Sequence, residues 1–329
     1  MDVPGWLWLA SIGGLLVLLA IDLVVVDRKP HEVTIGEAAK WVVFYVGCAV
    51  VFGLGVWLFA GGEYAGQFVA GYITEYSLSV DNLFVFVIIM SRFAVPAIHQ
   101  HKVLLIGILL ALVLRGLFIA VGAAVISLFT WVFYLFGAFL IYTAWKLGRE
   151  GIGSDEEFSE NAVLRTARRV LPVTDRYRGA RSFVREAGRF MVTPMFIVMI
   201  AIGTTDLLFA VDSIPAIFGL TKEPFLVFTA NAFALMGLRQ LYFLIGGLLD
   251  RLVYLSFGLA VILGFIGLKL ILDALHDNRL PFLNSGESVP VPTIEIELSL
   301  AVIVGVLFVT MVASLLKVRH DPDAARQAP

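Results

Sequence analysis

The sequence predicts an all-α polytopic membrane protein with about nine transmembrane helices, six of which form an inverted repeat of two three-helix units. Three observations predict this fold class. The 329 residues are 60% hydrophobic and only 15% charged, with a mean hydropathy of +0.92, which is more apolar surface than a soluble core can bury. The apolar residues are grouped in runs of about 20, the length that crosses a bilayer as a helix. Two groups of these runs are similar to each other in sequence.

The apolar runs mark nine predicted spans, at 6–26, 40–60, 68–90, 103–122, 125–147, 194–219, 225–246, 252–272 and 297–316. The first run is too long for the apolar part of a signal peptide and has Asp2, but no basic residue, before it. We therefore expect a retained helix there. The run between Lys102 and Lys146 is long enough for two spans, and we place the turn between them near Gly122.

The connecting segments alternate in basic content, and basic loops stay in the cytoplasm. The alternation predicts a multi-pass protein with its N-terminus outside and its C-terminus in the cytoplasm, which requires an odd number of spans. The chain then divides into a two-helix segment (1–66), a first repeat (67–147), a charged cytoplasmic loop (148–193), a second repeat (194–272), and an extracytoplasmic loop with the last helix and a cytoplasmic tail (273–329). We expect the 148–193 loop, which holds nine arginines, to be a solvated connector that is partly helical around 160–169.

The internal repeat rests on three matches in the same order. The span at 68–90 contains Glu75-Tyr-Ser-Leu-Ser-Val-Asp81-Asn82, and the span at 194–219 contains Asp206-Leu-Leu-Phe-Ala-Val-Asp212-Ser213. The next span of each group carries a Leu-Arg pair, at Arg115 and at Arg239, and the third spans contain similar Tyr-Leu motifs, at Tyr134 and at Tyr254. Because three is odd, the two copies enter the membrane from opposite sides, an arrangement typical of secondary transporters with a site near the midplane.

Four carboxylates lie within the spans at 68–90 and 194–219, where each costs about 2.5–3.5 kcal/mol on insertion scales and usually marks an ion or proton path. On a helix, residues seven apart share a face. The shared faces are Glu75 with Asn82, Thr74 with Asp81, Asp206 with Ser213, and Thr205 with Asp212. Because the copies are inverted, we predict two layers, Glu75 with Asp212 and Asp81 with Asp206. The acids could also do no more than hold helices together.

Three further residues support the predicted site. Pro215 follows Asp212 and lacks a backbone donor, so we expect it to kink or open the helix and to free a carbonyl for coordination. Arg115 and Arg239 are the predicted buried cations. They either neutralise the acids permanently or exchange partners when an ion binds.

The ligand types indicate a hard cation. The candidate ligands are carboxylate, amide and hydroxyl oxygens, which suit Mg²⁺, Ca²⁺ or Mn²⁺ rather than Zn²⁺ or Cu⁺. The five histidines lie outside the predicted spans, at His31, His99, His101, His276 and His320. The one cysteine, Cys48, excludes an intrachain disulfide. The residues alone leave a hard divalent cation and a proton open.

These motifs resemble the TerC family, and within it the Alx-like members, over essentially the whole chain. The resemblance is carried by the Glu75–Asn82 motif, by Phe209-Ala-Val-Asp212-Ser-Ile-Pro215-Ala-Ile-Phe218 and by Ala234-Leu-Met-Gly-Leu-Arg239-Gln-Leu-Tyr-Phe243. It implies a tellurite-resistance-related protein of the bacterial inner (cell) membrane, built like transporters with inverted three-helix repeats. It also implies manganese export, which makes Mn²⁺ the ion expected at the ligands that the helix faces predict, Glu75, Asp81, Asn82, Asp206, Asp212 and Ser213. The family pattern has a further acid three residues before Asp206, where this chain has Gly203.

Two function classes follow. The first is a secondary transporter that exports a hard divalent cation, Mn²⁺ by the resemblance, with the lipid bilayer and the ion as its partners. The second is a membrane scaffold or stress-response protein that acts through the 148–193 loop without transport. We expect no enzyme activity, no resident cofactor and no nucleic-acid partner, because no nucleophile–base motif, phosphate loop or long basic run is present. A homo-oligomer and a cytosolic partner both stay open.

Overall fold

The fold is described from a computed structural model of the chain. The structure describes residues 3–21, 34–129, 131–150, 162–174, 177–179, 181–186, 189–245, 253–276 and 287–320. Within these ranges, a few side chains lie outside the description, among them those of Asp81, Asn82 and Asp212.

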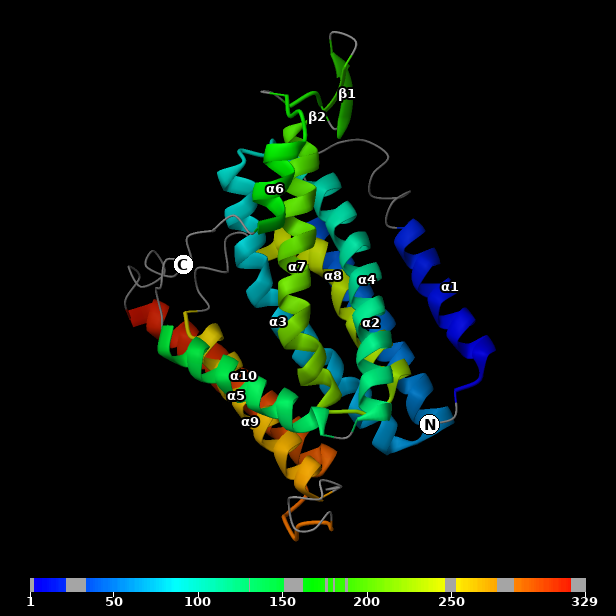
Figure 1. Ribbon diagram of the computed structural model, residues 1–329. Coiled ribbons are helices and arrows are strands. Elements are labelled where there is room, and N and C mark those ends of the chain that lie inside the picture. Colours follow the sequence, from blue (N-terminus) through cyan, green and yellow to red (C-terminus); the bar gives the residue numbers. More distant parts are fainter. Residues whose placement is uncertain are drawn as a thin grey trace.

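Helices dominate the described residues, and one short hairpin interrupts them (Figure 1). In chain order the elements are α1 (Gly5–Ile21), α2 (Ile35–Ala60), α3 (Gly62–Arg92), α4 (Ala97–Leu128), α5 (Val132–Glu150), α6 (Ala162–Val170), β1 (Phe183–Glu186), β2 (Arg189–Val192), α7 (Pro194–Phe218), α8 (Pro224–Ile245), α9 (Leu255–His276) and α10 (Ile296–His320). Each predicted span maps mainly onto one helix, except that the span at 125–147 begins in the last turn of α4 and continues as α5. Helix α6 lies within the predicted 148–193 loop.

Six of the described helices are long and apolar enough to cross a membrane: α2, α3, α4, α7, α9 and α10. The chain is therefore an all-α polytopic membrane protein. Large apolar side chains on the outside of the bundle agree with this, since Leu9 is 75% exposed and Phe59 is 93% exposed. A surface of this kind is covered by lipid rather than by water. The full count of nine spans stays a prediction.

The turn that we place near Gly122 is wrong. Helix α4 runs on to Leu128, and the described chain leaves the helix at Phe129. The reason is packing, because a Cβ at Gly122 would lie 3.1 Å from the ring of Phe218 on α7. This glycine allows two helices to approach closely, so it does not mark a turn.

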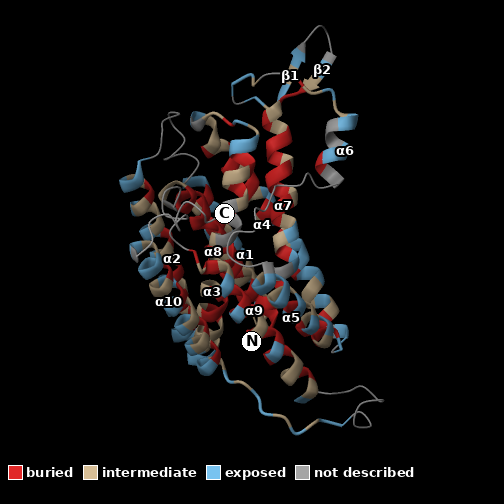
Figure 2. Cartoon of the chain, turned by 90° about the vertical axis from the view of Figure 1, so that its left-hand side faces the viewer, coloured by how far each residue is buried: buried red, intermediate tan, exposed pale blue. Residues whose placement is uncertain are grey.

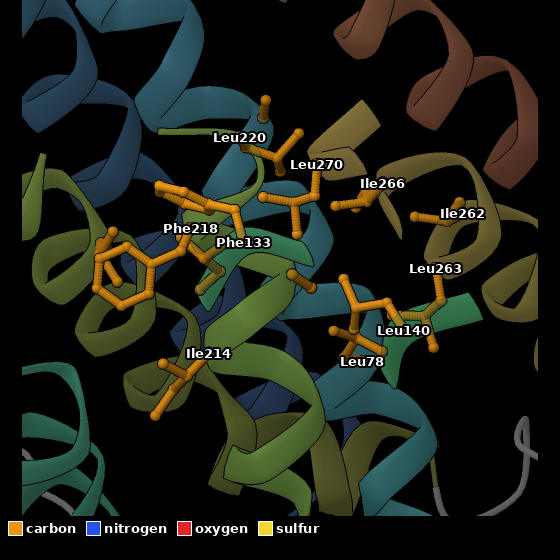
Figure 3. Packing of buried hydrophobic residues seen from close by; sticks show 14 of the residues in the cluster. Leu78, Phe133, Leu140, Ile214, Phe218, Leu220, Ile262, Leu263, Ile266 and Leu270 are labelled. Carbon is orange, nitrogen blue, oxygen red and sulfur yellow. The ribbon is translucent and has the colours of Figure 1, made fainter. Parts of the chain in front are cut away.

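The middle of the bundle is made of α3, α4, α7 and α8. Helix α3 packs against α8 and α4 packs against α7, while α5 packs along α9. Buried residues line the inside of the bundle and exposed residues line its outside (Figure 2). One apolar cluster joins four helices in Figure 3, with Leu78 from α3, Phe133 and Leu140 from α5, Ile214 and Phe218 from α7, and Ile262, Leu263, Ile266 and Leu270 from α9. These contacts hold the acid-bearing helices α3 and α7 against their neighbours.

The predicted loop at 148–193 contains more structure than a solvated connector. The helix expected around 160–169 is confirmed as α6, but the antiparallel β1–β2 hairpin is not predicted by the sequence analysis. Leu164 of α6 is fully buried in the cluster that includes Ile89 of α3 and Val198 of α7. The Tyr177 hydroxyl donates a hydrogen bond of 2.7 Å to the Phe93 carbonyl, just after α3. The described part of this loop therefore packs onto one end of the bundle.

Candidate functional site

Polar side chains from four helices meet inside the bundle. Glu75 on α3, Arg115 on α4, Asp206 on α7 and Asn231 on α8 are each at most 1% exposed. All four lie well inside their helices, and Asp206 is at the middle of α7. The residues that flank each of these side chains along its helix are strongly apolar. A polar side chain in such a helix faces the protein interior, because exposure to lipid is costly.

Arg115 is the centre of this cluster. Its Nε donates to Asp206 Oδ2 at 3.0 Å and its Nη2 donates to Asp206 Oδ1 at 3.1 Å, which makes a bidentate pair. Its Nη1 forms an ion pair with Glu75 Oε1 and donates to Ser213 Oγ at 3.3 Å. Bidentate guanidinium–carboxylate pairs are among the stronger hydrogen-bonded pairs in proteins. Arg115 thus joins the two acid-bearing helices α3 and α7 through one cation.

Asn231 is a site residue that the sequence analysis missed. Its Nδ2 donates to Glu75 Oε1 at 2.8 Å, so that oxygen accepts from α4 and from α8. The signal for it was present in the sequence, because Asn231 is an amide inside the apolar span at 225–246. A polar side chain in such a span usually faces the protein interior.

Three buried oxygens at or near the cluster accept or donate no hydrogen bond among the described residues: Glu75 Oε2, Thr74 Oγ1 and Ser79 Oγ. All three belong to α3, and Thr74 is next to Glu75 in the chain. An unsatisfied buried polar group costs about 1–3 kcal/mol. Carboxylate and hydroxyl oxygens of this kind are the ligands that a hard cation prefers.

The predicted assignment of Glu75 and Asp206 to separate layers is wrong. Both carboxylates contact the same guanidinium, so they lie at one level of the bundle. The prediction assumed that the axis relating the two inverted repeats lies level with the middle of each motif, between its two acids. The structure instead brings the first acid of α3 and the first acid of α7 together. The side chains of Asp81, Asn82 and Asp212 lie outside the description, so their predicted roles stay predictions.

The remaining predicted residues take varied positions. Thr205 is 7% exposed, and Arg239 is buried on α8, two turns beyond Asn231. Helix α7 continues through Pro215 to Phe218, so the proline does not end the helix. Because proline has no N–H, the carbonyl of Val211 loses its usual helical donor. Among the described residues, no group of three or more His, Cys, Asp and Glu side chains is placed to hold a metal ion.

Gly203 occupies the position where the family pattern has an acid. A Cβ at this position would collide with the side chain of Leu110 on α4. The space beside Gly203 is therefore filled from the neighbouring helix, and α4 and α7 approach closely there.

Other residues near the site pack in the apolar core. Met195 and Met199 lie in the buried apolar cluster with Val198. His101, which the sequence analysis places before a span, lies in the first turns of α4 and stacks on Phe243 with ring centroids 6.0 Å apart.

The profile of the integral membrane protein TerC family matches residues 60–321 of this chain. The chain belongs to the TerC family. The matched residues include α3, α4, α7 and α8, and with them the whole Arg115 cluster. The family assignment therefore confirms the resemblance that the acidic motifs carry.

Relatives that are matched over most of their own length agree with this membership. An uncharacterized membrane protein of Mycobacterium bovis is 50% identical over 97% of this chain and 81% of its own length. One of Myxococcus xanthus is 43% identical over 99% of this chain and 97% of its own length. The Escherichia coli protein provisionally named membrane-bound redox modulator Alx is 38% identical over 93% of each chain. No solved structure matches.

Proposed function

We propose that this TerC-family protein is a secondary transporter that exports a hard divalent cation from the bacterial cytoplasm, with Mn²⁺ as its cargo. The observation that carries the proposal is the fully buried cluster of Glu75, Arg115 and Asp206 in the middle of the bundle. Its polar groups come from helices that are far apart in the sequence, as in transporters with a midplane site.

The charges in this cluster argue for a role beyond structure. A buried ion pair seldom stabilises a protein more than apolar residues of the same size do. Charged groups inside a membrane are costly and usually mark an ion path. Two carboxylates around one guanidinium, with Glu75 Oε2 lacking a described donor, leave acidic oxygens for a second cation.

An inverted repeat of the units at 67–147 and 194–272 is part of the proposal. A two-fold axis in the membrane plane would relate α3 to α7, α4 to α8 and α5 to α9. Such an axis makes the α3–α8 contact equivalent to the α7–α4 contact, and both contacts are extensive. It would also bring the first acids of α3 and α7 together, which is how Glu75 and Asp206 lie.

The proposed cycle is an exchange of cations on the same acids. With no ion bound, Arg115 neutralises Asp206 and Glu75. A cation from the cytoplasm displaces the guanidinium from part of these oxygens, with Asp81 and Asp212 as further ligands. Rocking of the two repeats then exposes the ion to the outside. The oxygen ligands select a hard cation, and the choice of Mn²⁺ comes from the resemblance to Alx-like members.

The test is Mn²⁺ movement in inside-out vesicles that contain the natural chain or the variants Asp81→Asn, Asp206→Asn and Asp212→Asn. We expect the natural chain to accumulate Mn²⁺ and each variant to lose that activity while it still inserts normally. Glu297→Gln, which removes an exposed acid at the start of α10, is the matched control and should transport normally.

A scaffold or stress-response role is the second candidate, and one observation favours it. The described part of the 148–193 loop is folded and packs on the bundle through Leu164 and Tyr177. The scaffold role is the better account if two results are found together. The natural chain moves no Mn²⁺, and cells become sensitive to metal when this loop is mutated but not when the acids are.

A further inference from the structure

The hairpin of β1 and β2 carries aromatic and basic side chains on one of its faces. Phe183 is paired with Val192, and Arg185 is paired with Phe190. Cross-strand partners and residues two apart share a face of a hairpin, so these four side chains lie together. Phe183 is 48% exposed and Phe190 is 68% exposed. A group of aromatic rings this exposed usually marks a surface that contacts a membrane or another molecule.

The aromatic rings continue from the hairpin onto α7. The ring of Phe183 lies 4.8 Å from that of Phe196 and 5.8 Å from that of Phe190, measured between centroids. Phe196 is in the first turn of α7, and β2 ends at Val192, just before that helix begins. The three rings therefore form one row that runs from the helix onto the hairpin, which projects beyond the end of α7 in Figure 1.

The depth of this row follows from helix geometry. Asp206 is at the middle of α7, and we take its level as the middle of the bilayer. Phe196 precedes it by ten residues, which is about 15 Å along the axis. Half of the hydrocarbon thickness is also about 15 Å. Phe196 thus lies at the boundary of the hydrocarbon region, and Phe183 and Phe190 follow at the level of the headgroups.

Basic side chains accompany the aromatic row. Arg181 and Arg185 are exposed beside Phe183. Guanidinium groups bind phosphate with paired hydrogen bonds, and basic segments next to a membrane helix are attracted to anionic lipid. Aromatic rings are enriched at the same level of the membrane.

We propose that the β1–β2 hairpin is an interfacial anchor that binds anionic phospholipid headgroups. Phe183 and Phe190 insert between headgroups, and Arg181 and Arg185 bind lipid phosphates. A protein partner fits less well, because the row is continuous with a bilayer-crossing helix and lies at headgroup depth. The anchor holds the start of α7, the helix that carries Asp206, and it does not depend on the proposed transport activity.

The experiment places a fluorescent reporter in the full chain reconstituted into vesicles. Cys48→Ser removes the one natural cysteine, and Phe190→Cys is labelled with bimane, whose ring system replaces the phenyl ring. One set of vesicles contains phosphatidylcholine alone and the other adds phosphatidylglycerol, both with a trace of headgroup-spin-labelled lipid. We expect a shift of bimane emission to shorter wavelength and several-fold stronger quenching when phosphatidylglycerol is present.

The charge variants decide between lipid and protein contact. Arg181→Gln with Arg185→Gln should abolish the response to phosphatidylglycerol, and high salt should weaken it in the unchanged chain. Arg319→Gln, which removes an exposed charge near the end of α10, should leave the response intact. The proposal is overturned if quenching is absent in both lipid mixtures or is equal in both. It is also overturned if the emission shift occurs without quenching, because the reporter would then be covered by protein.

Discussion

Arg115 is the residue on which the two acid-bearing helices meet. It binds both oxygens of Asp206 and one oxygen of Glu75, and it is fully buried. A lysine could not make the same bidentate contact, because its ammonium is a single point of charge. The geometry of the site therefore depends on a guanidinium in particular, and a positive charge alone would not reproduce it.

Removing this guanidinium leaves two carboxylates buried without their shared cation. We expect Arg115→Gln to lower the free energy of unfolding by about 3–5 kcal/mol, the usual effect of breaking a buried ion pair. Arg115→Lys should recover only part of that loss. Thermal unfolding of the purified protein in detergent measures both variants. Unfolding temperatures equal to that of the natural chain would contradict these contacts of Arg115.

Asn231 donates to the same Glu75 oxygen that Arg115 contacts. We expect Asn231→Ala to cost about 1–3 kcal/mol, because a buried carboxylate oxygen loses a donor. In vesicles that transport Mn²⁺, the same variant should change the apparent affinity for the ion. Thr229→Ala is a suitable control, since among the described residues the Thr229 hydroxyl bonds only to backbone carbonyls of its own helix. If Asn231→Ala lowers the stability no more than Thr229→Ala does, Asn231 has no special role.

At the scale of elements, helices α5 and α9 cross at two glycines. A Cβ at Gly267 would lie 2.9 Å from the Gly137 carbonyl oxygen and 3.1 Å from the Ile141 nitrogen, both of which are backbone atoms. Backbone atoms cannot move aside as a flexible side chain does. Small residues at helix crossings are typical of membrane proteins, where close packing replaces the hydrophobic effect.

Gly267→Ala should therefore destabilise the protein by about 1–3 kcal/mol through overpacking. Gly264, one turn earlier on α9, offers a matched comparison, because its Cβ would meet Ala144 at an ordinary 3.5 Å. Gly264→Ala should be neutral or slightly stabilising. Unfolding temperatures in detergent test the pair, and equal temperatures for both variants would argue against the close crossing.

A side-chain hydrogen bond from Tyr177 joins the folded part of the 148–193 loop to the end of α3. Burial raises the pKa of Tyr177 from its ordinary value of 10.0, so the hydroxyl stays protonated at neutral pH and donates to Phe93. The pKa of Tyr177 is higher in the folded protein than in the unfolded chain. The contribution of its hydrogen bond to stability is therefore complete below the unfolded pKa. It is lost as the pH rises through the folded value.

We expect Tyr177→Phe to weaken the attachment by about 0.5–1.5 kcal/mol, the typical net value of a hydrogen bond. Limited proteolysis in inside-out vesicles should then cut the 171–193 segment faster than in the natural chain. The difference should be constant across neutral pH and should shrink only in strong alkali. Equal cleavage rates at neutral pH would show that the bond does not hold the segment.

At the scale of the whole molecule, the orientation in the membrane is a prediction from basic residues alone. The basic connecting segments, above all 148–193, place the N-terminus outside and the C-terminus in the cytoplasm. A fluorescent protein that folds only in the cytoplasm should fluoresce when fused after Pro329. A reporter enzyme that is active only outside should be active when fused before Met1. The opposite result at either end would reverse the proposed direction of export.

The sequence by itself determined the class of the protein and the identity of most polar residues in its core. Apolar runs of membrane length located the helices, because lipid imposes that length on any span. The repeated acidic motifs pointed to Glu75, Asp206 and Ser213, and the repeated Leu-Arg pair pointed to Arg115, since charges inside a membrane are too costly to occur without a role. The family followed from the same motifs.

Only the tertiary structure decided which of these groups meet. Helical periodicity shows which face a residue occupies, but it does not show where two helices cross. The crossing of α3 and α7 brought Glu75 and Asp206 onto one guanidinium, against the predicted layers. Close packing likewise kept Gly122 inside α4. Contacts between residues far apart in the sequence, such as Asn231 with Glu75, depend on how whole helices pack, and no local pattern encodes that packing.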